Sequence, residues 1–202
     1  MQHDDDDGAN QNEEITQTEL DTHAASIVVG RNALVINETG KTVNMGPFPK
    51  ELGSLKKVPI VDCVVAHDCP YSNETYYLAM YNALLVPQME ENLLPPFVVR
   101  RQGHILNDTP KIQVKSPTKD DHCLIFENGV GRIPLQLCDT ISYFTTRKPT
   151  EQEYLEASAE DKVIDLNVDE PTFIPSMEQN GTDKNMGEGG GAKLSKLRKR
   201  LK

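Results

Sequence analysis

The feature that most constrains the fold is a succession of short apolar runs that are rich in β-branched and aromatic residues. Turn-forming residues separate these runs, as in Asn37-Glu38-Thr39-Gly40. Short strands at this spacing are typical of an all-β sandwich or barrel, so we expect a mainly β fold. The expected strands cover residues 24–36 with a break at Gly30, then 58–65, 75–86, 112–114, 123–126, 133–137 and 141–144.

Two segments predict short helices. Pro95 and Pro96 suit the first turn of a helix that starts near Phe97. The Arg-Arg-Gln that follows, ending in Gly103, is a helix stop signal. Residues 151–159 are expected to form one or two further helical turns, for which Thr150 is a suitable cap.

Both ends of the chain differ in composition from the middle. Residues 1–18 are acidic and almost without apolar side chains, so burial cannot offset their chain entropy and we expect a disordered leader. Residues 151–191 are acidic and then Gly-rich, which predicts a linker, and residues 192–202 form a basic tail. The folded domain is therefore expected to span residues 19–150, which agrees with a mean hydropathy of -0.51 for the whole chain.

Composition also limits the partners and the location. A net charge of -10 argues against nucleic-acid binding by the whole surface, so only the basic tail offers contacts to phosphate. No apolar run approaches the roughly 20 residues that cross a bilayer, and the amino terminus lacks the apolar stretch of a secretory signal. We expect an intracellular protein, cytoplasmic or nuclear, without a membrane partner. Four glycosylation-type matches are accordingly interpreted as chance, at Asn37, Asn73, Asn107 and Asn180.

The cysteines indicate no metal or cofactor. Cys63, Cys69, Cys123 and Cys138 form no C-x-x-C pair, and a reducing compartment would keep them as thiols. His67 and His122 lie near cysteines in the sequence, but zinc ligands are usually paired more tightly. Gly-rich phosphate loops and a Ser-His-Asp order are absent from the sequence. We therefore interpret the cysteines as small hydrophobic residues and the histidines as surface residues.

The sharpest local motif is Glu19-Leu20-Asp21-Thr22-His23-Ala24-Ala25-Ser26, which precedes the strand-like run Ile27-Val28-Val29-Gly30. An apolar residue, then Asp-Thr or Asp-Ser, then Ala and a hydrophobic strand is the arrangement of an aspartic-protease active-site loop. That chemistry needs two nearby carboxylates that share one proton, so that one activates water and the other acts as an acid. The chain holds one such motif, so the second carboxylate would come from an identical subunit. Taken alone, the motif also fits a turn with a local side-chain hydrogen bond.

Two further blocks extend this pattern. Leu84-Leu85-Val86-Pro87, followed by Asn92-Leu93-Leu94 and later Gly103, resembles the copia-type retrotransposon protease, in which Asn-Leu-Leu opens a helix. The segment Ile141-Ser142-Tyr143-Phe144-Thr145-Thr146-Arg147-Lys148-Pro149-Thr150, with Ile133-Pro134-Leu135 before it, resembles a divergent protist and fungal branch of retroelement polyproteins. The resemblance covers most of residues 19–150. It implies a retropepsin-like β-sandwich or barrel that acts as a homodimer on a polypeptide substrate, without a cofactor or metal.

The resemblance also assigns roles to the motif. It implies that Asp21 is the catalytic aspartate, that Thr22 braces the loop, and that Ala24 packs beneath it. The divergent branch carries Leu-Asp-Ser-His-Ala, which matches His23, whereas copia elements and retropepsin-like proteases in general have Gly at this position. Three interpretations are open: the imidazole crowds the pair of aspartates, it points outward, or it tunes the acidity of Asp21. Residues 39–48 are the candidate for a mobile flap over the substrate, and an ordinary exposed hairpin is the alternative.

Three hypotheses for function follow. The leading one is an aspartic endopeptidase that processes its own polyprotein. The second is a catalytically inactive remnant of the same fold, which His23 has disabled and which serves as a dimerising or binding module. The third is a nucleic-acid adaptor that uses the basic tail.

Overall fold

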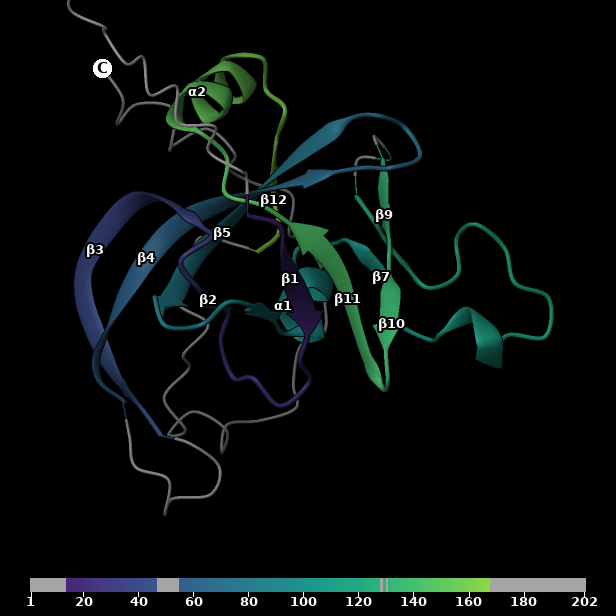
Figure 1. Ribbon diagram of the computed structural model, residues 1–202, viewed down its shortest axis with the longest axis horizontal. Coiled ribbons are helices and arrows are strands. Elements are labelled where there is room, and N and C mark those ends of the chain that lie inside the picture. Colours follow the sequence, from purple (N-terminus) through teal and green to yellow (C-terminus); the bar gives the residue numbers. More distant parts are fainter. Residues whose placement is uncertain (1–13, 47–54, 128, 130, 168–202) are drawn as a thin grey trace, which may run out of the picture.

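The three longest strands form two consecutive antiparallel hairpins. In this computed structural model, which describes residues 14–46, 55–127, 129 and 131–167, they are β3 (Leu34–Met45), β4 (Leu55–Asp68) and β5 (Thr75–Leu85). The carboxyl half of β4 is buried because its Cys-Val-Val-Ala run enters the core, whereas much of β3 stays exposed. The protein is mainly β, as the sequence predicted. Figure 1 shows the β3–β4 hairpin curving along the left side of the molecule, while the tip of the β4–β5 hairpin reaches to the upper right.

The central strands of the large sheet are short and come from distant parts of the sequence. The sheet order is β10-β11-β1-β6-β2-β5-β4-β3, and β12 pairs with β5 off this path. β1 (Thr16–Leu20) lies between β11 (Ile141–Thr146), with which it is antiparallel, and β6 (Asn92–Leu94), with which it is parallel. β2 (Val28–Val29) joins β6 to β5. The segment from 16 to 29 is thereby held between strands that lie far from it in sequence.

A second, three-stranded sheet packs against the same core. It consists of β7 (Ile105–Asn107), β8 (Cys123–Ile125) and β9 (Arg132–Pro134), and β10 (Gln136–Cys138) follows directly. The helix predicted near Phe97 is confirmed as α1 (Pro96–Arg101). The core draws on both sheets and on α1, with fully buried side chains that include Phe126, Phe144, Leu78, Leu94, Leu124 and Ile133.

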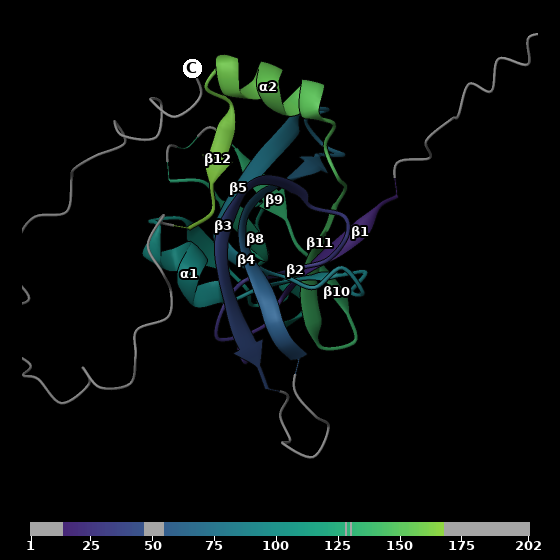
Figure 2. The ribbon, with the colours of Figure 1, turned by 90° about the vertical axis from the view of Figure 1, so that its left-hand side faces the viewer.

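The carboxyl end of the fold extends past the expected domain boundary. α2 (Glu151–Ala159) forms as predicted, with Thr150 in a capping box with Glu153. β12 (Val163–Asp165) then pairs in parallel with β5, and Leu166 is fully buried. The prediction that residues 151–191 are linker is therefore wrong for 151–167, because their few apolar residues fill the sheet edge beside β5. Figure 2 shows α2 lying across one end of the molecule, with β12 running from it beside β5.

Three further expectations need correction. The leader was expected to reach residue 18, but β1 begins at Thr16, and neighbouring strands hold Thr16 and Thr18 buried although they are polar. Residues 112–114 were expected to form a strand. Instead, Lys111–Gln113 is a turn of 3₁₀ helix after Pro110 with its apolar residue exposed, because this run has no partner strand. Asn92-Leu93-Leu94 forms β6 rather than the start of a helix.

Some expectations lie outside the described residues or meet them only in part. Residues 1–13, the end of the candidate flap at 47–48, the segment 168–191 and the basic tail 192–202 are outside them. The described part of the candidate flap, 39–46, continues β3 along β4. No helix in the described ranges is both long enough and apolar enough to span a bilayer.

Candidate active site

Asp21 lies in the turn that follows β1, and neighbouring main chain fixes its position. The Asp21 N–H donates to the carbonyl oxygen of Leu94 at 3.2 Å, which extends the parallel pairing of β1 with β6 by one residue. The Asp21 side chain is 31% exposed, and its Oδ1 accepts a hydrogen bond from the His23 N–H at 2.8 Å. This local bond is the turn motif that an Asp favours at such a position. The carboxylate is thus held by the backbone at an accessible edge.

The other residues of the motif surround this carboxylate within the same turn. The His23 side chain is 97% exposed, with Nδ1 3.8 Å from Asp21 Oδ1 and 3.4 Å from Thr22 Oγ1. Thr22 is exposed, whereas Ala24 is partly buried. Of the three interpretations of His23, an outward-pointing imidazole describes this single chain. Because the four predicted residues are consecutive, the turn alone brings them together.

A buried polar cluster lies beneath the turn, and sequence analysis did not find it. Asn92 and Thr18 are fully buried and Thr146 is nearly so. The Asn92 side-chain amide donates to Thr18 Oγ1 at 3.1 Å and to Thr146 Oγ1 at 3.5 Å, and the two hydroxyl oxygens are 2.9 Å apart. Asn92 Oδ1 accepts from the Gly30 N–H at 3.0 Å. One asparagine therefore joins β6 to β1, β11 and the start of the next loop. Its only sequence signal is a polar residue beside the Leu-Leu pair.

Gly30 is required by close packing rather than by an unusual backbone angle. A Cβ placed there would lie 2.3 Å from the carbonyl oxygen of Met89. The loop between β5 and β6 passes at this point, and Thr16 Oγ1 donates to the carbonyl oxygen of Glu90 in the same loop. The backbone contact at Gly30 thus positions β6, which in turn positions Asp21.

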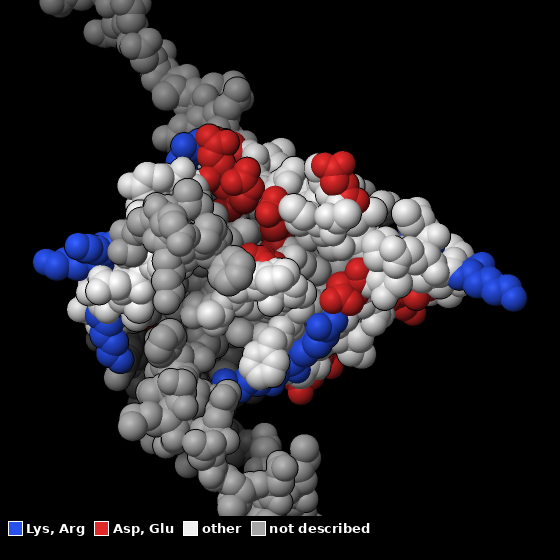
Figure 3. All heavy atoms as spheres, turned by 90° about the horizontal axis from the view of Figure 1, so that it is seen from below, with Lys and Arg blue, Asp and Glu red and all other residues white. Residues whose placement is uncertain are grey.

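The field around the Asp21 turn is negative. Burial raises the pKa of Glu19, and the negative charges of Glu91 and Asp21 raise it further. Glu19 on β1 is therefore within electrostatic reach of two other carboxylates, Glu91 just before β6 and Asp21 just after β1. Figure 3 shows the face toward which β1 points in Figure 1, where acidic side chains lie mostly across the upper half of the view and Lys and Arg lie at its two ends and along its lower part.

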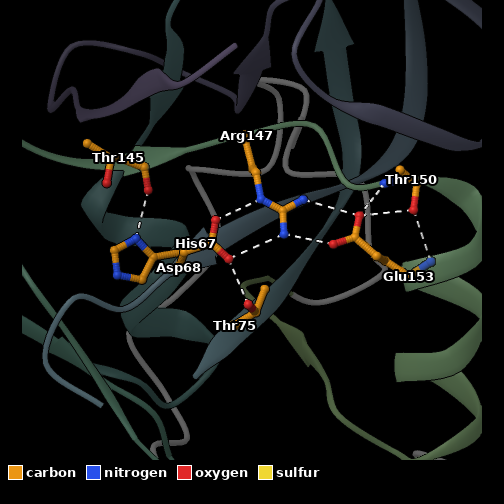
Figure 4. A network of polar contacts seen from close by, with 7 residues as sticks. All are labelled: His67, Asp68, Thr75, Thr145, Arg147, Thr150 and Glu153. Atoms are coloured by element: carbon orange, nitrogen blue, oxygen red, sulfur yellow. Dashed lines mark hydrogen bonds and ion pairs between the residues drawn. The ribbon is translucent and has the colours of Figure 1, made fainter. Parts of the chain in front are cut away.

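The strongest ion-pair network lies elsewhere, where β11 ends (Figure 4). The buried Arg147 guanidinium donates to Glu153 at 2.7 and 3.1 Å and to Asp68 at 2.7 and 3.3 Å. The hydrogen bonds that Arg147 donates to Glu153 and Asp68 outweigh the effect of burial and raise the pKa of Arg147. Conversely, hydrogen bonds from Arg147 lower the pKa of Glu153. This network joins β4, β11 and α2. The Asp68 side chain is 54% exposed, but both of its oxygens are bound to Arg147, so the network pairs its charges with one another.

Comparison with known proteins assigns no family to the chain. No protein-family model, no curated protein and no solved structure matches it. In the part of the chain that the structure describes, no group of three or more His, Cys, Asp or Glu side chains is arranged to hold a metal ion.

Proposed function

We propose that this protein is an aspartic endopeptidase whose active site forms when two copies bring their Asp21 turns together. The observation that carries the proposal is the position of Asp21, an accessible carboxylate at a strand end that β6 and the buried Asn92 cluster hold in place. The substrate is an extended polypeptide, as the resemblance to retroelement polyproteins implies.

The chemistry follows from the approach of two such carboxylates. Like charges a few Å apart cannot both ionise, so the pair holds one proton between them. The ionised member removes a proton from water, which attacks the peptide carbonyl, and the protonated member supplies a proton to the substrate. Thr22, beside Asp21 in each copy, would hold the two turns together through its hydroxyl.

An exposed apolar side chain lies close to the proposed contact. Leu94, whose carbonyl accepts the Asp21 N–H, is followed by Pro95 and then by α1. Phe97 in the first turn of α1 is 71% exposed. Burial of such a ring between two copies would contribute about 2 kcal/mol per copy. This surface supports association of two chains at the same edge that carries Asp21.

The test is cleavage of a mixed peptide library by the purified full-length chain between pH 4 and 7, with and without a pepstatin-type inhibitor. We expect Asp21→Asn to reduce cleavage by about a thousandfold or more, because the general acid–base pair is lost. Asp139→Asn is the matched control, because Asp139 is exposed and has a positive φ that Asn tolerates. Cleavage that survives Asp21→Asn, or that Asp139→Asn removes equally, would contradict the proposal.

A second function, the inactive dimerising or binding module, is favoured by one observation. The His23 imidazole projects from the turn beside Asp21, at the position where copia elements carry Gly. In a dimer, two such rings would enter the space between the carboxylates. His23→Gly separates the two functions. A dimer by sedimentation that cleaves no peptide, and that gains cleavage in His23→Gly, would establish the module.

A further inference from the structure

A cavity of about 470 Å³ opens where the β4–β5 connection, the β7–β8 connection and β9 converge. This volume is within the size range of small-molecule sites. Thr16 at the start of β1 pairs with Thr146, and the next residue, Arg147, pairs with Ala66 in β4, shortly before the β4–β5 connection. Asp21 follows the other end of β1. The cavity therefore lies toward the opposite end of the sheet from Asp21.

The β7–β8 connection, residues 108–122, brings two lysines to this cavity. Connections of this length inside a compact domain often carry a binding function. Lys111 belongs to the 3₁₀ turn Lys111–Gln113, and Lys119 lies in a second turn farther along. In that second turn the Asp121 carboxylate accepts the Thr118 N–H at 2.7 Å and the Thr118 hydroxyl at 2.8 Å. The connection thus places both lysines at the cavity through its own local structure.

A third cation, Arg132 at the start of β9, also lines the cavity. It forms an ion pair with Asp120, the residue after Lys119, and this pair joins β9 to the β7–β8 connection. Part of the Arg132 charge is balanced in this way, whereas Lys111 and Lys119 are exposed. Within the described part of the chain, every charged residue that lines the cavity is Lys or Arg. The lining therefore favours an anion.

Two tyrosines line the same cavity from β5 and the connection before it. The Tyr76 ring is fixed, because it stacks on His67 with ring centroids 6.4 Å apart and meets Phe126 edge-on at 5.2 Å. Gly131 allows the residues before β9 to approach this ring, since a Cβ there would lie 2.5 Å from the Tyr76 hydroxyl oxygen. Tyr71, by contrast, is 79% exposed. The lining thus combines a rigid ring, an exposed ring and cations.

We propose that this cavity binds a nucleoside monophosphate, with Lys111 and Lys119 on the phosphate and Tyr71 stacked on the base. Lysine binds phosphate as a point charge, and an aromatic side chain stacks on any base because every base has a π-face. A simple anion would make no use of the exposed Tyr71 ring, and an uncharged aromatic ligand would make no use of the lysines. A nucleoside monophosphate presents both groups. Because Asp21 lies at the other end of the sheet, this site is independent of the proposed peptide cleavage.

The experiment is titration calorimetry of the full-length protein with adenosine monophosphate, adenosine and inorganic phosphate at one salt concentration. We expect adenosine monophosphate to bind at least about tenfold more tightly than either of the others, because it alone makes both the charged and the stacking contacts. Equal affinity for adenosine would exclude the phosphate contact, and equal affinity for inorganic phosphate would exclude the stacking. Either result would overturn the proposal.

Paired lysine variants distinguish the cavity from general attraction of phosphate by the chain, to which the basic residues 192–202 would contribute. Lys111→Ala combined with Lys119→Ala should weaken binding of adenosine monophosphate by about tenfold or more and leave adenosine unaffected. Lys41→Ala combined with Lys56→Ala is the matched control, because both of these lysines are exposed and lie outside the cavity lining. Equal losses in the two double variants would overturn the proposal.

Variants of Tyr71 test the stacking separately. Tyr71→Ala should weaken binding of adenosine monophosphate by about fivefold or more, whereas Tyr71→Phe keeps the ring and should bind like the wild type. Because Tyr71 is exposed, urea unfolding should be unchanged in both variants, which shows that the fold is intact. Unchanged binding in Tyr71→Ala, or an equal loss in Tyr71→Phe, would contradict the proposed position of the base.

Discussion

The two ends of the β1–β11 pair are held in opposite ways. Beyond Thr146, the Arg147 guanidinium is enclosed by two carboxylates that satisfy it, and its side chain is only 9% exposed. At the other end, Asp21 is held through its main chain and through the neutral Asn92 cluster. Its carboxylate accepts the local His23 N–H and lies 3.8 Å from the exposed His23 ring. A fully paired charge stabilises the fold, whereas a charge that the backbone positions and leaves accessible is available for chemistry. The comparison explains why the most conspicuous ion-pair network is not the candidate active site.

The largest expected effect on stability comes from Arg147→Ala. It leaves Asp68 and Glu153 without their partner, and we expect a loss of about 3 kcal/mol in the free energy of unfolding, at the lower end for broken buried pairs because both carboxylates keep some hydration. Urea unfolding measures it. Arg132→Ala, which breaks a more exposed pair with Asp120, is the control and should cost less than about 1 kcal/mol. Equal losses in the two variants would remove the distinction between the two ends.

The next largest expected effect on stability tests the Asp21 end of the β1–β11 pair. Gly30→Ala forces a Cβ against the Met89 carbonyl, so β6 must shift, and we expect a loss of about 2 kcal/mol. Gly46→Ala is the matched control, because a Cβ there meets nothing within 4 Å and the substitution should be nearly neutral. If Asp21 is catalytic, Gly30→Ala should also lower the cleavage rate of the fraction that remains folded. A stable Gly30→Ala protein would show that the loop adapts.

Low pH should reduce the stability that the Arg147 end of the β1–β11 pair contributes. Burial lowers the pKa of His67, so below pH 6.5 the unfolded chain binds a proton at this residue more readily than the folded chain does. The free energy of unfolding therefore decreases as the pH drops below 6.5. Against the opposing effect of burial, hydrogen bonds from Arg147 and Thr75 lower the pKa of Asp68. Hydrogen bonding to Arg147 lowers that of Glu153. Asp68 and Glu153 contribute fully to the free energy of unfolding when the pH is above their ordinary pKa values of 3.8 and 4.5. These contributions are lost as the pH falls through the lowered pKa values of the folded protein.

Urea unfolding at pH values from 7 to 3 measures this dependence. Arg147→Ala removes the largest of the effects that lower the pKa of Asp68 and Glu153, while the hydrogen bonds from Thr75 and Thr150 remain. The stability of the variant should therefore depend less on pH below 4.5, and the dependence that starts near 6.5 should persist. Parallel curves for wild type and variant would show that these carboxylates contribute nothing. The same experiment sets the lowest pH at which a cleavage assay on folded protein is meaningful.

The sequence predicted the strands and helices whose signals are local. α2 was predicted because Thr150 and the acidic turn after it are neighbours, and α1 because Pro96 starts it and Gly103 follows it. The pairing partners were not predictable in this way. Thr16 and Thr18 are polar residues that occupy a central strand only because β6 and β11 bind both of its edges, and nothing within residues 1–18 records this.

The candidate site shows the same limit. Asp21 and its neighbours were identified because they are consecutive, whereas Asn92 and Gly30 act through contacts across 74 and 62 positions, respectively. The Asp68–Arg147 pair spans 79 positions. Residue types were visible in the sequence, but their surroundings were not.

The smallest expected effect comes from Thr150→Ala, which removes the cap of α2. The Thr150 hydroxyl accepts the Glu153 N–H at 3.2 Å, and Glu153 Oε2 accepts the Thr150 N–H at 2.7 Å. We expect a loss of about 1 kcal/mol, while Thr150→Ser keeps the hydroxyl and should be nearly neutral. Both variants are compared with wild type by urea unfolding.

The Glu153 carboxylate both caps α2 and binds Arg147. The Thr150 variants therefore also test the Arg147 end of the β1–β11 pair. If the cap also positions Glu153 for the ion pair, Thr150→Ala and Arg147→Ala will not be additive, and the double variant will lose less than the sum of the two. Glu153→Gln separates the two roles, since Gln can complete a capping box but carries no charge for Arg147. A stability loss in Glu153→Gln close to that of Arg147→Ala would mean that the ion pair fixes this end, whereas a loss near zero would assign that role to the cap.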